Sequence, residues 1–133
     1  MWLRRVFQGL KASQSEPEAA GSKVPQKPAI EQITPRELRD RLGDSSLQLV
    51  DVREEHELRY CSIDGAVHIP MRRLMGGGET DLDPSKAVVV YCHRGVRSML
   101  TAYYLAGCGF NVLNLKGGIH AWSEEVDPNV PTY

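Results

Sequence analysis

The hydrophobic and polar positions of residues 30–125 change period several times, and this pattern predicts strands that alternate with helices. The run Ala87-Val88-Val89-Val90-Tyr91 is apolar throughout, which is typical of a strand at the centre of a parallel sheet covered on both faces. Further strands are predicted at residues 47–52, 66–70 and 111–115. Strands that alternate with helical segments indicate an α/β domain.

Helical segments between these strands are marked by capping residues and by apolar positions three or four residues apart. Thr34-Pro35-Arg36-Glu37 combines the residues of a capping box with a proline in the first turn, and Leu38 and Leu42 supply an apolar face. Additional helices are predicted at residues 54–60, 96–106 and 119–123, with one helical turn at residues 71–75.

Residues 1–28 differ in composition from the rest of the chain. The segment Trp2-Leu3-Arg4-Arg5-Val6-Phe7 is basic and partly apolar, and residues 13–28 are a linker-like mixture of polar residues, Ala, Gly and Pro. We therefore expect a flexible N-terminal extension over residues 1–28 and a folded domain over residues 29–133. The alternative for the extension is a short plastid transit sequence, because arginine-containing, acid-poor starts resemble such segments.

Composition and charge narrow the function classes. The chain of 133 residues carries a net charge of −1, so nothing global indicates a nucleic-acid partner. No apolar run approaches the roughly 18 residues of a membrane span. The three cysteines, Cys61, Cys92 and Cys108, include no CxxC pair, which argues against a disulfide framework and a structural zinc site. A free reactive thiol suits a reducing compartment, so we expect a cytoplasmic protein with no bound metal.

The strongest chemical signal is the run Cys92-His93-Arg94-Gly95-Val96-Arg97-Ser98, between a predicted strand and a predicted helix. Backbone N–H groups converge at such a turn and at the helix N-terminus, where they favour an anion or a thiolate. Gly95 permits the turn, and Arg94 and Arg97 add permanent positive charge that suits a small anionic substrate. The loop therefore predicts that Cys92 attacks an oxyanion and forms a covalent intermediate, the alternative being an inert buried cysteine.

The length of this loop distinguishes between several reactions. Loops of the tyrosine-phosphatase type place an arginine at the sixth position after the cysteine. Here the sixth position is Ser98, and Arg97 comes one residue earlier. The shorter loop predicts a smaller cradle that suits sulfur better than a phosphoryl group, which disfavours phosphatase or arsenate reductase chemistry.

Four segments in order resemble the signatures of the rhodanese (sulfurtransferase) family in its single-domain form. They are Leu49-Val50-Asp51-Val52-Arg53-Glu54, Ile63-Asp64-Gly65-Ala66-Val67-His68-Ile69-Pro70, the Cys92 loop, and Gly117-Gly118-Ile119-His120-Ala121-Trp122. The tail Val126–Tyr133 is similar to tails of cyanobacterial and plastid members, whereas Ser62 departs from the family's usual histidine. The resemblance implies a rhodanese-like α/β fold, with a central five-stranded, mostly parallel sheet flanked by helices on both faces.

The resemblance also implies a reaction. The Cys92 thiolate would take a sulfane sulfur from a donor such as thiosulfate, become a persulfide and release sulfite. Cyanide or a thiol, for example a protein thiol such as that of thioredoxin, would then remove the sulfur without any cofactor. A persulfide carrier or partner-binding module with little turnover is the alternative, although an intact cysteine loop speaks against a degenerate binding domain. We expect a monomer with no membrane or nucleic-acid partner.

The other candidate residues are assigned by their place relative to the nucleophile. The substrate-binding candidates all lie in its loop and are Arg97 first, then Arg94, His93, Gly95 and Val96. The backbone N–H groups of residues 93–97 would hold the outer sulfur, and the His93 side chain is expected to face solvent. Asp51 and Arg53 end a strand at the same edge as supporting residues. We favour a structural ion pair that ties this strand to the loop over a direct role in orienting the loop.

Overall fold

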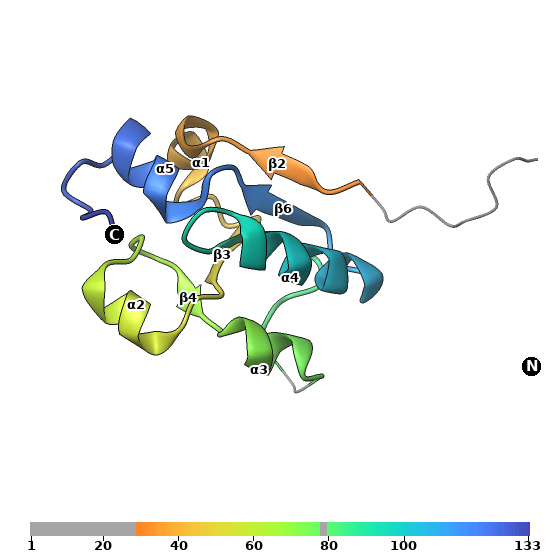
Figure 1. The fold of residues 1–133 in the computed structure, drawn as a ribbon. Helices are drawn as coiled ribbons and strands as arrows, with labels where there is room; N and C mark the ends of the chain where they lie inside the picture. The colour runs from red at the N-terminus through yellow and green to blue at the C-terminus, as the bar shows by residue number, and fades with distance from the viewer. Residues whose placement is uncertain (1–28, 78–79) are drawn as a thin grey trace, which may run out of the picture.

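The computed structural model describes residues 29–77 and 80–133, which fold into an open α/β sheet (Figure 1). Five strands lie in the order β2-β6-β5-β3-β4. Their bounds are Glu31–Ile33 for β2, Leu47–Asp51 for β3, Val67–His68 for β4, Ala87–Tyr91 for β5 and Val112–Leu115 for β6. All four pairings between these strands are parallel, which confirms the predicted five-stranded sheet. The expected extension over residues 1–28 lies outside the described residues.

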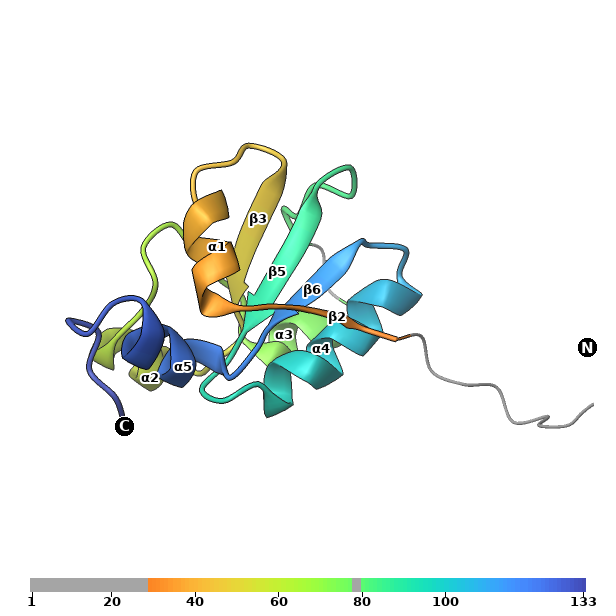
Figure 2. The same cartoon turned by 90° about the horizontal axis from the view of Figure 1, so that it is seen from above.

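Helices cover both faces of the sheet, as predicted (Figure 2). The bounds are Pro35–Arg41 for α1, Glu55–Tyr60 for α2, Met71–Met75 for α3, Val96–Gly107 for α4 and Gly118–Glu125 for α5. Helices α1 and α5 contact each other on one face, whereas α3 and α4 contact each other on the opposite face. Helix α2 lies near the carboxyl ends of the strands, beside the C-terminal segment of the chain (Figures 1 and 2).

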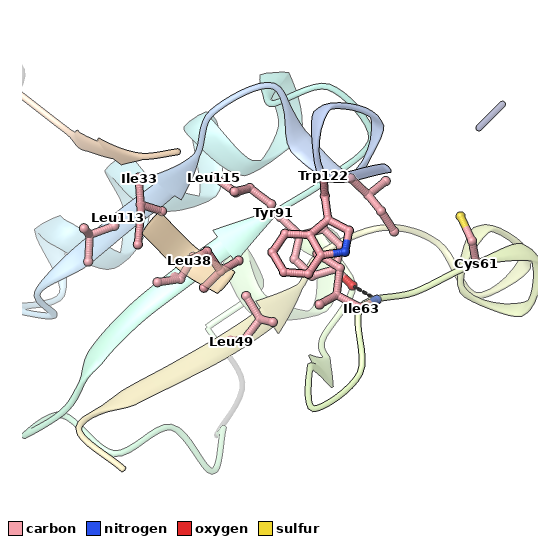
Figure 3. Close-up of a cluster of buried hydrophobic side chains, with 11 residues drawn as sticks. Ile33, Leu38, Leu49, Cys61, Ile63, Tyr91, Leu113, Leu115 and Trp122 are labelled. Atoms are coloured by element: carbon pink, nitrogen blue, oxygen red, sulfur yellow. Dashed lines mark hydrogen bonds between the residues drawn. The ribbon is translucent and has the colours of Figure 1, made fainter. Parts of the chain in front are cut away.

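The central strand β5 contributes side chains to the hydrophobic clusters on both faces of the sheet, because successive side chains of a strand point to opposite faces. Val89 and Tyr91 join the cluster under α1 and α5, with Leu38 and Trp122 (Figure 3). The Tyr91 hydroxyl also accepts a hydrogen bond from the backbone N–H of Ile63 at 3.1 Å, which ties the segment after α2 to this strand. The second cluster, under α3 and α4, contains Val88, Val90 and the Cys92 side chain. The uninterrupted apolar run thus occupies the centre of the sheet.

The predicted start of α1 is confirmed in detail. The Thr34 hydroxyl accepts from the Glu37 backbone N–H at 3.1 Å, and the Glu37 carboxylate accepts from the Thr34 N–H at 2.9 Å. This reciprocal capping box satisfies donors that the first helical turn leaves free. The cap fixes the start of α1 directly after β2, the outer strand that pairs with β6.

Two strands differ from the predictions. No strand is predicted over residues 31–33. In the structure two residues of β2 are exposed and only Ile33 is buried, so the strand has no alternating pattern. The strand forms because its backbone pairs with β6, with Glu31 opposite Leu113. The strand predicted at residues 66–70 is reduced to β4, which lies at the sheet edge and pairs with β3 at two positions only. Pro70, two residues after β4, has no backbone N–H to offer a longer ladder.

Candidate active site

Cys92 leaves the central strand and turns directly into α4. Gly95, immediately before the helix, has a φ of +109°, a conformation that L side chains rarely adopt. This turn brings two backbone N–H groups onto the Cys92 Sγ atom, from Gly95 at 3.1 Å and from Ser98 at 3.3 Å. The cysteine is only 1% exposed. The sulfur therefore lies in a small nest of donors that favours a negatively charged sulfur.

Ser98 is a site residue that the sequence analysis counted but did not assign to the site. Its Oγ lies 3.3 Å from the Cys92 Sγ and 2.5 Å from the Asn114 Oδ1 on β6. The Asn114 amide in turn donates to the Gln32 side chain on β2 at 3.3 Å. A hydroxyl has one proton, so Ser98 gives it either to the asparagine oxygen or to the sulfur. The signal in the sequence is the position of Ser98 in the first turn of the helix that follows the nucleophile.

The N-terminus of α5 holds the loop through hydrogen bonds to two of its carbonyl groups. The Ile119 N–H donates to the Cys92 carbonyl at 2.9 Å, and the His120 N–H donates to the His93 carbonyl at 3.1 Å. Gly118 allows this approach because a Cβ there would lie 2.4 Å from the His93 carbonyl oxygen and 2.6 Å from that of Cys92. The Cys92 and His93 carbonyls thus bind α5, while the N–H groups of Gly95 and Ser98 point toward the Cys92 sulfur.

Arg97, the first candidate for contact with an anion, is held by a carboxylate. Its two terminal nitrogens donate to the two oxygens of Glu57 on α2, at 2.6 and 2.8 Å. The hydrogen bond to Arg97 is the main reason why the pKa of Glu57 is far below its usual range. Glu57 was not singled out from the sequence, because no local pattern on α2 points to a loop 40 residues away. Much of the positive charge of Arg97 is therefore already compensated.

Arg94, by contrast, is exposed. It borders an open pocket with a volume of about 570 Å³, together with Val96 and Lys116 among others. Val96 is 74% exposed. Of the two arginines in the loop, Arg94 is thus the more exposed to solvent.

Asp51 and Arg53 form a fully buried ion pair, with Arg53 Nη2 at 2.7 Å from Asp51 Oδ2. Although burial disfavours its charge, the hydrogen bond to Asp51 holds the pKa of Arg53 above its ordinary value. In the described residues, the Arg53 guanidinium otherwise contacts the Cys61 carbonyl at 2.6 Å and the Tyr133 hydroxyl at 2.9 Å. The ion pair expected from the sequence is present, and its guanidinium extends toward Cys61 at the end of α2 and toward Tyr133 in the C-terminal segment.

The expectation that the His93 side chain faces solvent is wrong. Its ring stacks on the Tyr133 ring, with centroids 3.9 Å apart and planes inclined by 8°, and it lies 6.0 Å from the His120 ring. Burial is the main reason why the pKa of His93 is below its ordinary value, which favours the neutral imidazole. The Tyr133 side chain escaped the sequence analysis because it is brought to the loop only when the tail folds back.

The other cysteines lie elsewhere. Cys61 is buried at the end of α2, and Cys108 is exposed after α4. Among the described residues, no group of three or more His, Cys, Asp or Glu side chains is arranged to hold a metal ion. Nor does the part of the chain with assigned structure contain a helix long and apolar enough to cross a membrane.

A parallel sheet with a cysteine in an N–H-lined turn between its central strand and a helix defines a class of α/β domains with a nucleophilic thiol. The model of the family described as "Rhodanese-like domain" matches residues 34–125, which include the whole loop. The chain belongs to this family of rhodanese-like domains.

Known proteins give the same result. The chain is 35% identical over 103 residues to "Sulfurtransferase" of Allochromatium vinosum, covering 76% of this chain and 95% of that protein. It is 38% identical over 113 residues to "Rhodanese-like/PpiC domain-containing protein 12, chloroplastic" of Arabidopsis thaliana, where the match covers 78% of this chain but 38% of that protein. A rhodanese-like domain protein from Staphylococcus aureus has a similar structure, with a TM-score of 0.65 and 30% identity over 78% of this chain and 99% of its own.

Proposed function

We propose that the protein moves sulfane sulfur from a small anionic donor such as thiosulfate to cyanide or a thiol, through a persulfide on Cys92. The observation that carries this proposal is the arrangement of donors around the Cys92 sulfur, from two backbone N–H groups and the Ser98 hydroxyl. Such an arrangement stabilises a thiolate both as attacking and as leaving group.

In the first step, the Cys92 thiolate attacks the outer sulfur of thiosulfate. A sulfur–sulfur bond to Cys92 forms, the bond between the two thiosulfate sulfurs breaks, and sulfite leaves with the electron pair. In the second step, the acceptor attacks the outer sulfur of the persulfide, and the Cys92 thiolate is released. Attack by the carbon of cyanide would give thiocyanate, and attack by a thiolate would give a new persulfide on the acceptor. Neither step needs an external oxidant or reductant.

The charges around the loop support an anionic donor of small size. Arg94 presents an exposed positive charge, whereas Glu57 compensates much of the charge of Arg97. The backbone N–H groups of Gly95 and Ser98 add a directed partial positive charge next to the sulfur. Because Cys92 is almost fully covered, we propose that a bulky acceptor is reached by the outer persulfide sulfur rather than by the cysteine sulfur itself.

The test measures thiocyanate formation from thiosulfate and cyanide with the wild type and with Cys92→Ser. Cys108→Ser is the matched control, since it changes an exposed thiol outside the loop. We expect turnover in the wild type and in the control, and none with Cys92→Ser. Mass spectrometry after thiosulfate treatment should find one added sulfur on Cys92. A wild type that gains no sulfur from any sulfane donor would rule the proposal out, and an added sulfur without turnover would favour a persulfide carrier.

The proposal extends to partners and compartment. A protein thiol such as that of thioredoxin is proposed as an acceptor for a monomeric protein in the cytoplasm. The chloroplastic name of the Arabidopsis relative supports the plastid alternative. Fusion of residues 1–28 to a fluorescent protein in plant cells separates the two compartments, because only a transit sequence would direct the fusion to plastids.

A further inference from the structure

The hydroxyl of Tyr133 connects two ion pairs that belong to different parts of the fold. It accepts a hydrogen bond from Arg53 Nη1 at 2.9 Å and donates one to Glu57 Oε2 at 2.7 Å. The same Glu57 oxygen accepts from Arg97 Nη2 at 2.8 Å. The Tyr133 hydroxyl and the Arg97 guanidinium therefore donate to the same oxygen of Glu57. Arg97 lies five residues after Cys92 in the loop.

The aromatic ring of Tyr133 is held as firmly as its hydroxyl. One face stacks on His93 at 3.9 Å between centroids, and the Tyr60 ring packs against it edge to face at 5.7 Å. Burial raises the pKa of Tyr133 to about 12, so the phenol is protonated and remains a donor at neutral pH. Nothing in the sulfur-transfer steps requires this hydroxyl.

We propose that Tyr133 is a positioning residue that sets how strongly the Cys92 loop attracts an anionic donor, acting through Glu57 and Arg97. The hydroxyl proton draws negative charge of the Glu57 carboxylate away from Arg97. More of the guanidinium charge then remains uncompensated beside the sulfur. The Cys92 thiolate lies near enough to Arg97 to contribute to the raised pKa of that arginine, after the larger effect of Glu57. The inference rests on the proposed function only in taking the donor to be an anion.

The charge effect can be measured without turnover. Iodoacetate and iodoacetamide are similar in size and both alkylate the thiolate, but only iodoacetate is an anion. The ratio of their rates at Cys92 therefore reports the local potential and not the fraction of thiolate. Peptide mass spectrometry of the full chain gives the rates for each cysteine separately. The exposed Cys108 supplies an internal reference. Cys61, which is 8% exposed, reports opening of the fold, and Cys92, which is 1% exposed, reacts in the folded protein only if its rate exceeds that of Cys61.

Tyr133→Phe keeps the stacked ring and removes only the hydroxyl. We expect it to lower the iodoacetate-to-iodoacetamide ratio at Cys92 about threefold, because a hydrogen bond to a charged group is lost. The ratio at Cys108 should not change. Tyr60→Phe is the matched control: it removes a phenol that contacts the Thr132 carbonyl at 3.4 Å and keeps the ratio of the wild type. A ratio for Tyr133→Phe equal to that of Tyr60→Phe overturns the proposal.

A double-mutant cycle tests the route of the effect. In a Glu57→Gln background the carboxylate charge is absent, so the ratio at Cys92 should rise and Tyr133→Phe should have no further effect. A threefold drop that persists in this background overturns the route through Glu57. Because each variant is compared within its own background, partial destabilisation by Glu57→Gln does not change the comparison, and reaction of Cys61 identifies any unfolded fraction.

Steady-state kinetics separates positioning from a merely structural role. Tyr133→Phe should lower kcat/KM for thiosulfate, a dianion, more than kcat/KM for cyanide, which reacts as a monoanion, because the effect of a local potential scales with the charge that enters it. A structural defect lowers both constants equally, since both scale with the amount of active enzyme. If the wild type forms no persulfide, the proposed function fails, whereas the alkylation ratio still decides the role of Tyr133.

Discussion

Replacement of Gly118 by alanine should separate the hold of α5 on the Cys92 loop from the ordinary cost of a left-handed backbone. Gly118 has a φ of +66°, and its Cβ would lie 2.4 Å from the His93 carbonyl oxygen. Gly65→Ala is the matched control, because Gly65 has a φ of +89° with nothing within 4 Å of an added Cβ. Both variants place an alanine in a left-handed backbone conformation. Only Gly118→Ala also brings the new Cβ against the His93 carbonyl oxygen.

The structure sets the expected sizes. Left-handed backbone at a non-glycine residue costs about 1–2 kcal/mol, which is the whole effect expected for Gly65→Ala. In Gly118→Ala the carbonyl must also retreat by about 0.6 Å to reach a contact of 3.0 Å from 2.4 Å, which is an overpacking cost. The same shift weakens the bonds from α5 to the Cys92 and His93 carbonyls. We expect a total loss of about 3–5 kcal/mol in the free energy of unfolding.

Urea unfolding followed by circular dichroism measures this loss, and thiocyanate formation by the folded protein measures the state of the loop. Gly118→Ala should lose most of its activity at urea concentrations where it is still folded, whereas Gly65→Ala should keep the activity of the wild type. Equal losses of stability in the two variants, with unchanged activity in both, would refute the reasoning that close packing of α5 shapes the nest around the sulfur.

Two further predictions concern side chains next to Cys92. Ser98→Ala keeps the backbone donor but removes the hydroxyl, which donates either to the Cys92 sulfur or to Asn114 Oδ1, so we expect kcat to fall about tenfold and stability to fall by about 1–3 kcal/mol. Unchanged turnover would show that the hydroxyl does not serve the sulfur. Because the pKa of His93 is lowered in the folded state, the unfolded chain binds the proton first as pH falls below about 6.5, so stability should fall there. Urea unfolding at pH 7.5 and about pH 5.5 checks this, and His93→Phe, which keeps an aromatic ring on Tyr133, should be less sensitive to pH.

The sequence predicted those helices and strands whose formation depends on residues adjacent in the chain. The apolar run of β5 and the capping box of α1 each depend on neighbouring residues, and both predictions are confirmed. Strand β2 was missed because its three residues gain their structure from pairing with β6, about 80 residues further along the chain. A strand that is defined by its partner leaves no periodic pattern of its own.

The candidate site divides in the same way. The loop from Cys92 was predicted to gather backbone N–H groups, and its turn at Gly95 follows from residues adjacent in the chain. The partners of its side chains were not predicted. Arg97 is the first candidate for contact with an anion, and the structure adds that it is paired with Glu57. His93 was expected in solvent, yet its ring stacks on that of Tyr133. These partners are about 40 residues away from the loop in either direction.

The sequence alone therefore determined the turn that follows Cys92 and most of the order of strands and helices that places this cysteine at the carboxyl end of the central strand. These features depend on backbone conformation, which short stretches of residues encode directly. Only the tertiary structure decided which charges near Cys92 are compensated and which face solvent. That balance depends on distances between side chains from α2, the loop and the tail, because electrostatic interactions and burial are properties of the packed molecule.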